Sequence, residues 1–285
     1  MSEGKFKIIS PHAKPSPFVL VDGNLTTTNV PEAEHAAYNP ATTYSTVGER
    51  VILVSPTSTI TISIANPAVV TWTAHSIPDK CAFNISTTGL LPTGLSVTTN
   101  YYVGNVTTNT FTLSKSPGGV AVATTGTQSG VHTGVATMHS IYEVLAATTA
   151  GEHPVLFPAK WARVSATNRW KMFDTSTSSQ TTNADTIDFT IQTVGRADAL
   201  ALMELSTNTA QVIVTDTVDG VVYDQTKQGR EMAGITLPSN WFFDAVEFKR
   251  EMDFTDIPVL YSNTTIQVIL THTGSTVECG VCVPG

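Results

Sequence analysis

Charged residues are scarce in this chain. Only 13% of the 285 residues are Asp, Glu, Lys or Arg, whereas an ordinary soluble domain holds about a quarter. The 15 basic and 23 acidic residues give a formal net charge of −8, and no run of Lys or Arg forms a basic stripe. We therefore expect no nucleic-acid partner, because binding to phosphates requires a positive surface.

Long apolar runs and a cysteine framework are also missing. No apolar run approaches the roughly 20 residues of a membrane span, so we expect no membrane insertion. The first ten residues lack the apolar core and cleavage site of a secretory signal. The three cysteines, Cys81, Cys279 and Cys282, are an odd number for a disulfide framework and favour synthesis in a reducing cytoplasm.

The usual catalytic and metal-binding motifs are absent as well. No nucleophile elbow, phosphate loop, dinucleotide fingerprint or His-Glu-x-x-His occurs, so we assign no catalytic residue, no metal and no cofactor, and we expect no enzyme. The lone Cys279-Gly-Val-Cys282 indicates a terminal strand rather than a zinc or redox site. Asp216-Thr-Val-Asp219-Gly220 indicates a hairpin turn, with a Ca²⁺ loop as the alternative.

Thr, Ser, Val and Gly are abundant where an ordinary soluble domain would have charged residues. Because β-branched residues fit a pleated surface and lose rotamer freedom in a helix, this composition predicts an all-β protein. A chain of 285 residues is long enough for two or three domains of ordinary size. We therefore predict an all-β, multi-domain chain, which begins with a polar arm over 1–35 whose one strand candidate is Phe18–Val21.

Residues 57–137 alternate between apolar and polar side chains in short segments separated by Gly, Pro and Asn. This pattern predicts an inserted antiparallel β-sandwich or barrel. The expected strands are Thr59–Ile64, Ala68–Thr73, Cys81–Ile85, Asn100–Val103, Thr110–Ser114 and Val120–Val122.

Several motifs in this segment occur together and in the same order in a known kind of module. They are Thr88-Gly-Leu-Leu-Pro-Thr-Gly-Leu95, Asn100-Tyr-Tyr-Val103, Thr110-Phe-Thr-Leu-Ser114 and Thr125-Gly-Thr-Gln-Ser-Gly-Val-His-Thr133. Residues 68–134 thereby resemble a β-rich module of tail-fibre and other virion proteins of tailed bacteriophages. The resemblance implies a component of a particle rather than a metabolic enzyme.

The segments on either side of the insertion, 36–56 and 138–164, resemble two halves of one small domain. Joined together, Tyr44, Gly48-Glu-Arg-Val51, Ile141-Tyr142, Thr149-Ala-Gly-Glu-His-Pro154 and Trp161 resemble the carbohydrate-binding module attached to bacterial chitinases, which also occurs in phage tail proteins. The resemblance implies a three-stranded sheet with Tyr44, Tyr142 and Trp161 in its core. A sheet this small needs large aromatic side chains to bury enough surface.

The sequence departs from the sugar-binding members of that family at one place. Exposed aromatic residues follow the second Tyr strand in those members, but Leu145-Ala-Ala147 stands here. The resemblance therefore supports the fold more strongly than chitin binding. Tyr38, Trp72 and Trp170 are the candidates for a different carbohydrate-binding platform, and a place in the core is the alternative for each.

Residues 165–285 are predicted to form a second, jelly-roll-like sandwich. Its first segment, Asn168-Arg-Trp-Lys-Met-Phe-Asp174, resembles one that often follows the small module in phage tail proteins. The expected strands are Asp185–Thr193, Ala199–Leu205, Ala210–Asp216, Gly220–Tyr223, Trp241–Phe248, Phe254–Leu260 and Thr264–Thr271.

This order of modules favours a structural component of a tailed-phage virion, in the tail, baseplate or fibre apparatus. We expect it to be made in the host cytoplasm and to assemble with other tail proteins and with copies of itself. The alternative is an adsorption protein that binds a host-surface polysaccharide. A polysaccharide-degrading enzyme is a third reading, and it would need two carboxylates on opposite sides of one glycosidic bond.

Overall fold

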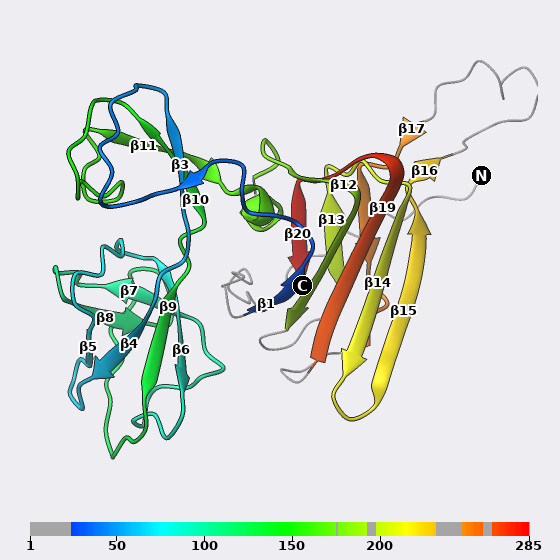
Figure 1. Ribbon diagram of the computed structural model, residues 1–285. Coiled ribbons are helices and arrows are strands. Elements are labelled where there is room, and N and C mark those ends of the chain that lie inside the picture. Colours follow the sequence, from blue (N-terminus) through cyan, green and yellow to red (C-terminus); the bar gives the residue numbers. More distant parts are fainter. Residues whose placement is uncertain (1–23, 175, 193–197, 232–246, 259–263, 285) are drawn as a thin grey trace, which may run out of the picture.

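The computed structural model describes residues 24–174, 176–192, 198–231, 247–258 and 264–284. The protein is all-β and multi-domain, as the composition predicts. A closed barrel and a small sheet lie on one side of a six-residue 3₁₀ helix, η2, and a β-sandwich lies on the other (Figure 1). No helix in these ranges is long and apolar enough to cross a membrane.

The inserted segment forms the barrel. Its strands hydrogen-bond in the order β4-β5-β8-β7-β6-β9 and close on themselves, so that no strand edge is left open. The barrel includes β9, which the sequence pattern did not predict, whereas Val120–Val122 forms only an isolated bridge between Ala121 and Ser114. The barrel strands are β4 (Thr57–Ile62), β5 (Val69–Thr71), β6 (Ala82–Thr87), β7 (Tyr101–Gly104), β8 (Thr110–Ser114) and β9 (His132–Ala136).

The segments on either side of the barrel come together in one sheet. β3 (Arg50–Leu53) pairs with β10 (Ser140–Val144) in antiparallel register, and β10 pairs with β11 (Trp161–Ala166). A salt bridge of 2.8 Å joins Arg50 to Glu143 across this pairing. The sheet has four strands rather than three, because β2 (Ala36–Ala37) adds a short parallel strand beside β3.

Large aromatic side chains fill the core of this small domain. Tyr44, Trp161, Val51 and Val144 are buried together, and Tyr38 and Tyr142 pack against them. The ring centroids of Tyr44 and Trp161 lie 5.1 Å apart in an edge-to-face arrangement, which suits the quadrupoles of two aromatic rings. Aromatic residues from both halves of the split segment therefore share one core.

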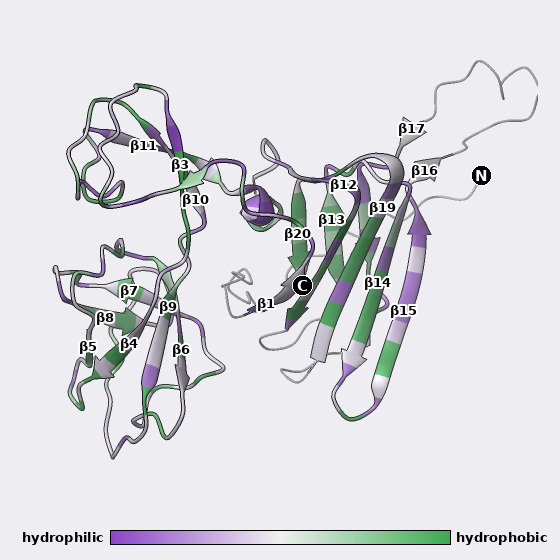
Figure 2. Cartoon of the chain, in the orientation of Figure 1, coloured by the Kyte–Doolittle hydropathy of each residue, from purple (hydrophilic) through white to green (hydrophobic). Residues whose placement is uncertain are grey.

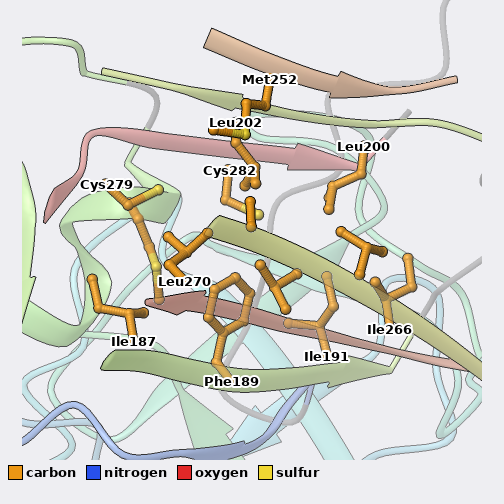
Figure 3. Packing of buried hydrophobic residues seen from close by; sticks show 14 of the residues in the cluster. Ile187, Phe189, Ile191, Leu200, Leu202, Met252, Ile266, Leu270, Cys279 and Cys282 are labelled. Atoms are coloured by element: carbon orange, nitrogen blue, oxygen red, sulfur yellow. The ribbon is translucent and has the colours of Figure 1, made fainter. Parts of the chain in front are cut away.

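The C-terminal part is a sandwich of a five-stranded and a three-stranded sheet, in the orders β1-β12-β19-β14-β15 and β18-β13-β20. Apolar residues alternate with polar ones along β14 and β19 (Figure 2), and the buried residues of both strands belong to the core of the sandwich. Ile266 and Leu270 of β19 point toward Leu200, Leu202 and Cys282 of the three-stranded sheet (Figure 3). The strands are β1 (Leu25–Thr28), β12 (Thr181–Gln192), β13 (Leu200–Met203), β14 (Thr209–Asp216), β15 (Gly220–Gln228), β18 (Glu251–Phe254), β19 (Thr264–Cys279) and β20 (Val281–Pro284), and β16 (Arg230–Glu231) pairs separately with β17 (Glu247–Phe248).

The Cys-x-x-Cys segment lies at the turn from β19 to β20. Cys279 and Cys282 are buried free thiols in the core of the sandwich (Figure 3). Burial raises the pKa of Cys279 to about 12, so this thiol stays protonated at neutral pH. The two residues serve as small apolar side chains on neighbouring strands of opposite sheets.

The arm packs against its own chain within the described residues. β1 pairs with β12 at the edge of the five-stranded sheet, and Val30 is buried in the sandwich core. Part of the segment predicted as a polar arm therefore belongs to the sandwich. The strand expected at Phe18–Val21 and most of the one expected at Trp241–Phe248 lie outside the described residues.

Candidate functional site

A cleft opens where the barrel, the small domain and η2 (Asn168–Phe173) meet. Its volume of about 580 Å³ is within the usual range for small-molecule sites, which are often found between domains. We call it the junction cleft. Its lining comprises Leu53, Pro78, Asp79, Lys80, Cys81, Ala82, Tyr102, Thr137, Met138, His139, Ser140, Tyr142, Arg163, Ala166, Trp170, Phe173 and Asp174.

The cleft forms where the chain passes twice between the small sheet and the barrel, and we call these two connections the crossings. The chain leaves the small sheet after Leu53 to enter the barrel, and it returns at Ser140 directly opposite Leu53. η2 begins two residues after the end of β11, which brings Trp170 beside the returning chain. The cleft is thus lined by segments that are distant in the sequence.

Three aromatic side chains that line the junction cleft each carry a polar atom without a protein partner. Within the described ranges, neither the Tyr102 nor the Tyr142 hydroxyl forms a hydrogen bond, and burial raises the pKa of both phenols. The indole N–H of Trp170 is buried and also has no acceptor there. A buried donor without a partner costs about 1–3 kcal/mol relative to a bonded one.

The charged residues of the cleft balance one another. Lys80 and Arg163 are cationic, and Asp79 and Asp174 are anionic. Arg163 donates from Nε to Ser140 Oγ at 3.1 Å. Asp174 accepts hydrogen bonds from Ser176 and Ser179. The lining therefore offers both donors and acceptors with no excess of either charge.

A chain of hydrogen bonds fixes one wall of the cleft. Glu32 Oε1, from the arm, accepts from His139 Nδ1 at 2.6 Å and from Thr167 Oγ1 at 2.7 Å. His139 Nε2 lies 2.9 Å from Ser55 Oγ. The side chains of Glu32 and His139 are only 7% exposed. We call Glu32, His139 and Ser55 the junction relay.

The junction relay ties together the arm, both crossings of the chain and η2. The His139 ring also stacks on Trp170, with centroids 4.4 Å apart and an interplanar angle of 13°. Burial raises the pKa of Glu32, but hydrogen bonds from His139 and Thr167 and the positive charge of Arg169 outweigh it, so that the pKa of Glu32 is lowered. Glu32 therefore stays ionised at neutral pH.

The hydrogen bonds run from a carboxylate (Glu32) to a histidine (His139) to a serine (Ser55), as they do in the catalytic triad of a serine hydrolase. A nucleophilic serine must also be open to the substrate and lie near donors for the oxyanion. Ser55 Oγ instead accepts the backbone N–H of Met138 at 3.0 Å, and Ser55 does not line the junction cleft. We therefore interpret the junction relay as a structural feature that holds the two chain segments entering and leaving the barrel in place.

The structure separates the three residues proposed as a carbohydrate platform. Trp72 is only 8% exposed and lies in the barrel core, so its use for stacking on a sugar is wrong. Tyr38 stacks on Tyr44 with centroids 5.8 Å apart, inside the small domain. Trp170 is 5% exposed and lines the junction cleft, where His139 already covers one face of its ring.

The core aromatics of the small domain differ in their surroundings. Tyr44 and Trp161 are buried, and the Trp161 indole donates to Glu152 O at 3.0 Å. Tyr142 packs against the cores of both the small domain and the barrel and also lines the junction cleft. The sequence does not predict Tyr102, Glu32, His139 or Ser55 as site residues, because no local motif marks residues that meet only after the modules fold.

Comparison with known proteins gives little for this chain. No protein-family model and no curated protein matches it. Among solved structures, it is similar to a GH29 fucosidase from Ruminococcus gnavus in complex with fucose (9% identity, TM-score 0.27) and to a mutant of that fucosidase, also with fucose (8% identity, TM-score 0.28). Each match covers 40% of this chain and 21% of the fucosidase chain, and at these TM-scores it carries no argument about function.

Proposed function

We propose that this protein is a structural component of a tailed-bacteriophage virion, located in the tail, baseplate or fibre apparatus. The observation that carries the proposal is the combination of a split small domain with a barrel inserted between β3 and β10. The motifs of the barrel segment are those that resemble phage tail-fibre modules. The protein acts by assembling with other tail proteins and with copies of itself.

The arrangement of the modules supports this role. The barrel joins the small domain through two adjacent crossings, and the junction relay holds both of them to the arm. The barrel lies next to the small domain (Figure 1), and Asn100, just before β7, also donates a hydrogen bond to Asn24 beside β1. Modules tied together in this way suit a particle whose parts must repeat in register.

Antibody labelling tests the proposal. Antibodies raised against the purified chain should decorate tails of intact particles in electron micrographs, and mass spectrometry of purified particles should detect the chain. Particles that contain none of it would overturn the proposal.

The second candidate function is adsorption to a host-surface polysaccharide, and it is compatible with the first. The junction cleft favours it, because aromatic side chains with unpaired polar atoms line this cleft. Purified protein should sediment with host cells and with their extracted polysaccharide. Failure to sediment with either would remove this candidate.

A further inference from the structure

We propose that the junction cleft binds a short, neutral saccharide through the hydroxyl groups of Tyr102 and Tyr142 and the indole N–H of Trp170. The proposal rests on the adsorption function above and gives it a site. The site differs from the small domain's own aromatic core, because Tyr102 comes from the barrel and Trp170 comes from η2.

The unpaired polar atoms define what the ligand must supply. The Trp170 N–H can only donate, so it requires an acceptor, whereas each tyrosine hydroxyl can both donate and accept. A sugar hydroxyl also does both, and a run of hydroxyl groups can therefore satisfy all three side chains. An apolar ligand would leave all of these atoms without partners.

The remaining lining fits the same class of ligand. Met138, Phe173 and the tyrosine rings present apolar surface to the C–H groups of a sugar ring. The two cationic and two anionic residues balance, which favours a ligand without net charge. The size of the cleft limits the bound part to a few sugar units.

Nuclear magnetic resonance of the full-length chain tests the proposal directly. The protein, labelled with nitrogen-15, is titrated with maltotriose, cellotriose and chitotriose, and the indole N–H signals are followed. We expect at least one trisaccharide to shift the Trp170 signal in a saturable way below about 10 mM. The Trp161 signal should stay in place, because that N–H already donates to Glu152.

Variants that remove a single polar atom identify the contacts. Tyr102→Phe and Tyr142→Phe should each weaken binding about fivefold to tenfold, since each loses one hydrogen bond. Trp170→Phe assigns the indole signal and should weaken binding by a similar factor. Tyr38→Phe is the matched control, because Tyr38 packs in the small domain and does not line the cleft. Thermal unfolding of each variant verifies that it is folded.

Two results would overturn the proposal. The first is a Trp170 signal that none of the three trisaccharides shifts at about 10 mM. The second is a Tyr38→Phe variant that loses more affinity than the cleft variants. Sedimentation with host polysaccharide separates the site from the function. If wild type and Tyr102→Phe/Tyr142→Phe sediment equally, the site is wrong but the adsorption function stands; if wild type does not sediment, the adsorption function fails as well.

Discussion

Glu32 is a carboxylate whose surroundings favour its ionised form. Its pKa in the folded chain lies below the usual value of 4.5, so ionised Glu32 stabilises the fold above pH 4.5. This contribution is lost as the pH falls through the lower, folded-state pKa. We predict that Glu32→Gln lowers the free energy of unfolding at pH 7 by about 1–3 kcal/mol, the usual cost of a lost charge-assisted hydrogen bond.

Chemical denaturation of wild type and Glu32→Gln at several pH values measures this effect. The difference between the two proteins should shrink as the pH falls below 4.5, because wild-type Glu32 then becomes protonated. Glu34→Gln is the control. The Glu34 carboxylate accepts a hydrogen bond from the Asn168 N–H, and the amide oxygen of glutamine can still accept it. A difference that is constant from pH 7 into acid would contradict the assignment.

His153 gives a second pH dependence, in the small domain. Burial lowers the pKa of His153 to about 4, from its usual 6.5, and its ring meets Tyr38 edge-on with centroids 5.2 Å apart. Between these two pH values the unfolded chain binds the proton and the folded chain does not, so stability falls as the pH falls from 6.5 to 4. The expected loss is about 2–3 kcal/mol.

Replacing His153 by a side chain that cannot titrate should remove this loss. Nδ1 of His153 accepts a hydrogen bond from the Val155 N–H, and the side-chain oxygen in His153→Asn can replace this acceptor. We expect this variant to be less stable at pH 7 and to lose about 2–3 kcal/mol less than wild type between pH 6.5 and 4. Fluorescence of Trp161, which packs in the same core, reports the unfolding. An equal slope with pH in both proteins would be the contrary result.

Strand β9 depends on a glycine. A Cβ atom on Gly134 would lie 2.4 Å from Phe83 Cζ and 3.2 Å from Ile60 Cγ2, and both of those side chains are buried in the barrel core. We predict that Gly134→Ala lowers the free energy of unfolding of the barrel by about 1–3 kcal/mol, as overpacking of cores does. Fluorescence of Trp72, inside the barrel, measures the change.

Gly104→Ala is the matched control in the same barrel. A Cβ atom on Gly104, in strand β7, would meet only Thr112 Oγ1 at 3.4 Å. This variant should cost less than Gly134→Ala. If the two substitutions cost the same, the close approach of Phe83 to β9 does not limit the packing of the barrel.

The strands that were predicted correctly show a clear alternation of apolar and polar residues. The segment Thr110–Ser114 matches β8 residue for residue, and the turn at Asp216–Gly220 is a hairpin between β14 and β15 in which Asp216 accepts the N–H of Val218 at 2.7 Å. β1 escaped prediction because Leu25–Thr28 is mostly threonine and pairs with β12, more than 150 residues away in the chain.

The junction cleft could not be read from the sequence for a related reason. Glu32 and His139 are separated by 107 positions, and Ser55 and His139 by 84. A periodic pattern reports which side of a strand is buried, but it does not report which distant polar side chains then meet. Trp170 was singled out as an aromatic residue, yet its place beside His139 required the fold of three modules.

The barrel and the small domain share apolar contacts at their boundary. Leu53 and Met138, which flank the insertion, are buried with the barrel core, and Tyr142 packs against the same cluster. The ends of the insertion lie close together, since Ala136 N donates to Pro56 O at 3.2 Å. A short turn can therefore replace residues 57–136 without stretching β3 or β10.

We predict that a chain shortened in this way still folds, but with a weaker small domain. Leu53 and Met138 would lose their cover, and burial of one such side chain contributes about 1.5–3 kcal/mol. The small domain, followed by the fluorescence of Trp161, should thus unfold at a lower denaturant concentration than in the full chain. Among the described residues, the sandwich core contains none from the barrel, so the sandwich should unfold as before. A second shortened chain carrying Leu53→Thr and Met138→Gln should aggregate less, because the uncovered surface is then polar. Loss of any cooperative Trp161 transition in both shortened chains would show instead that the small domain cannot fold without the barrel.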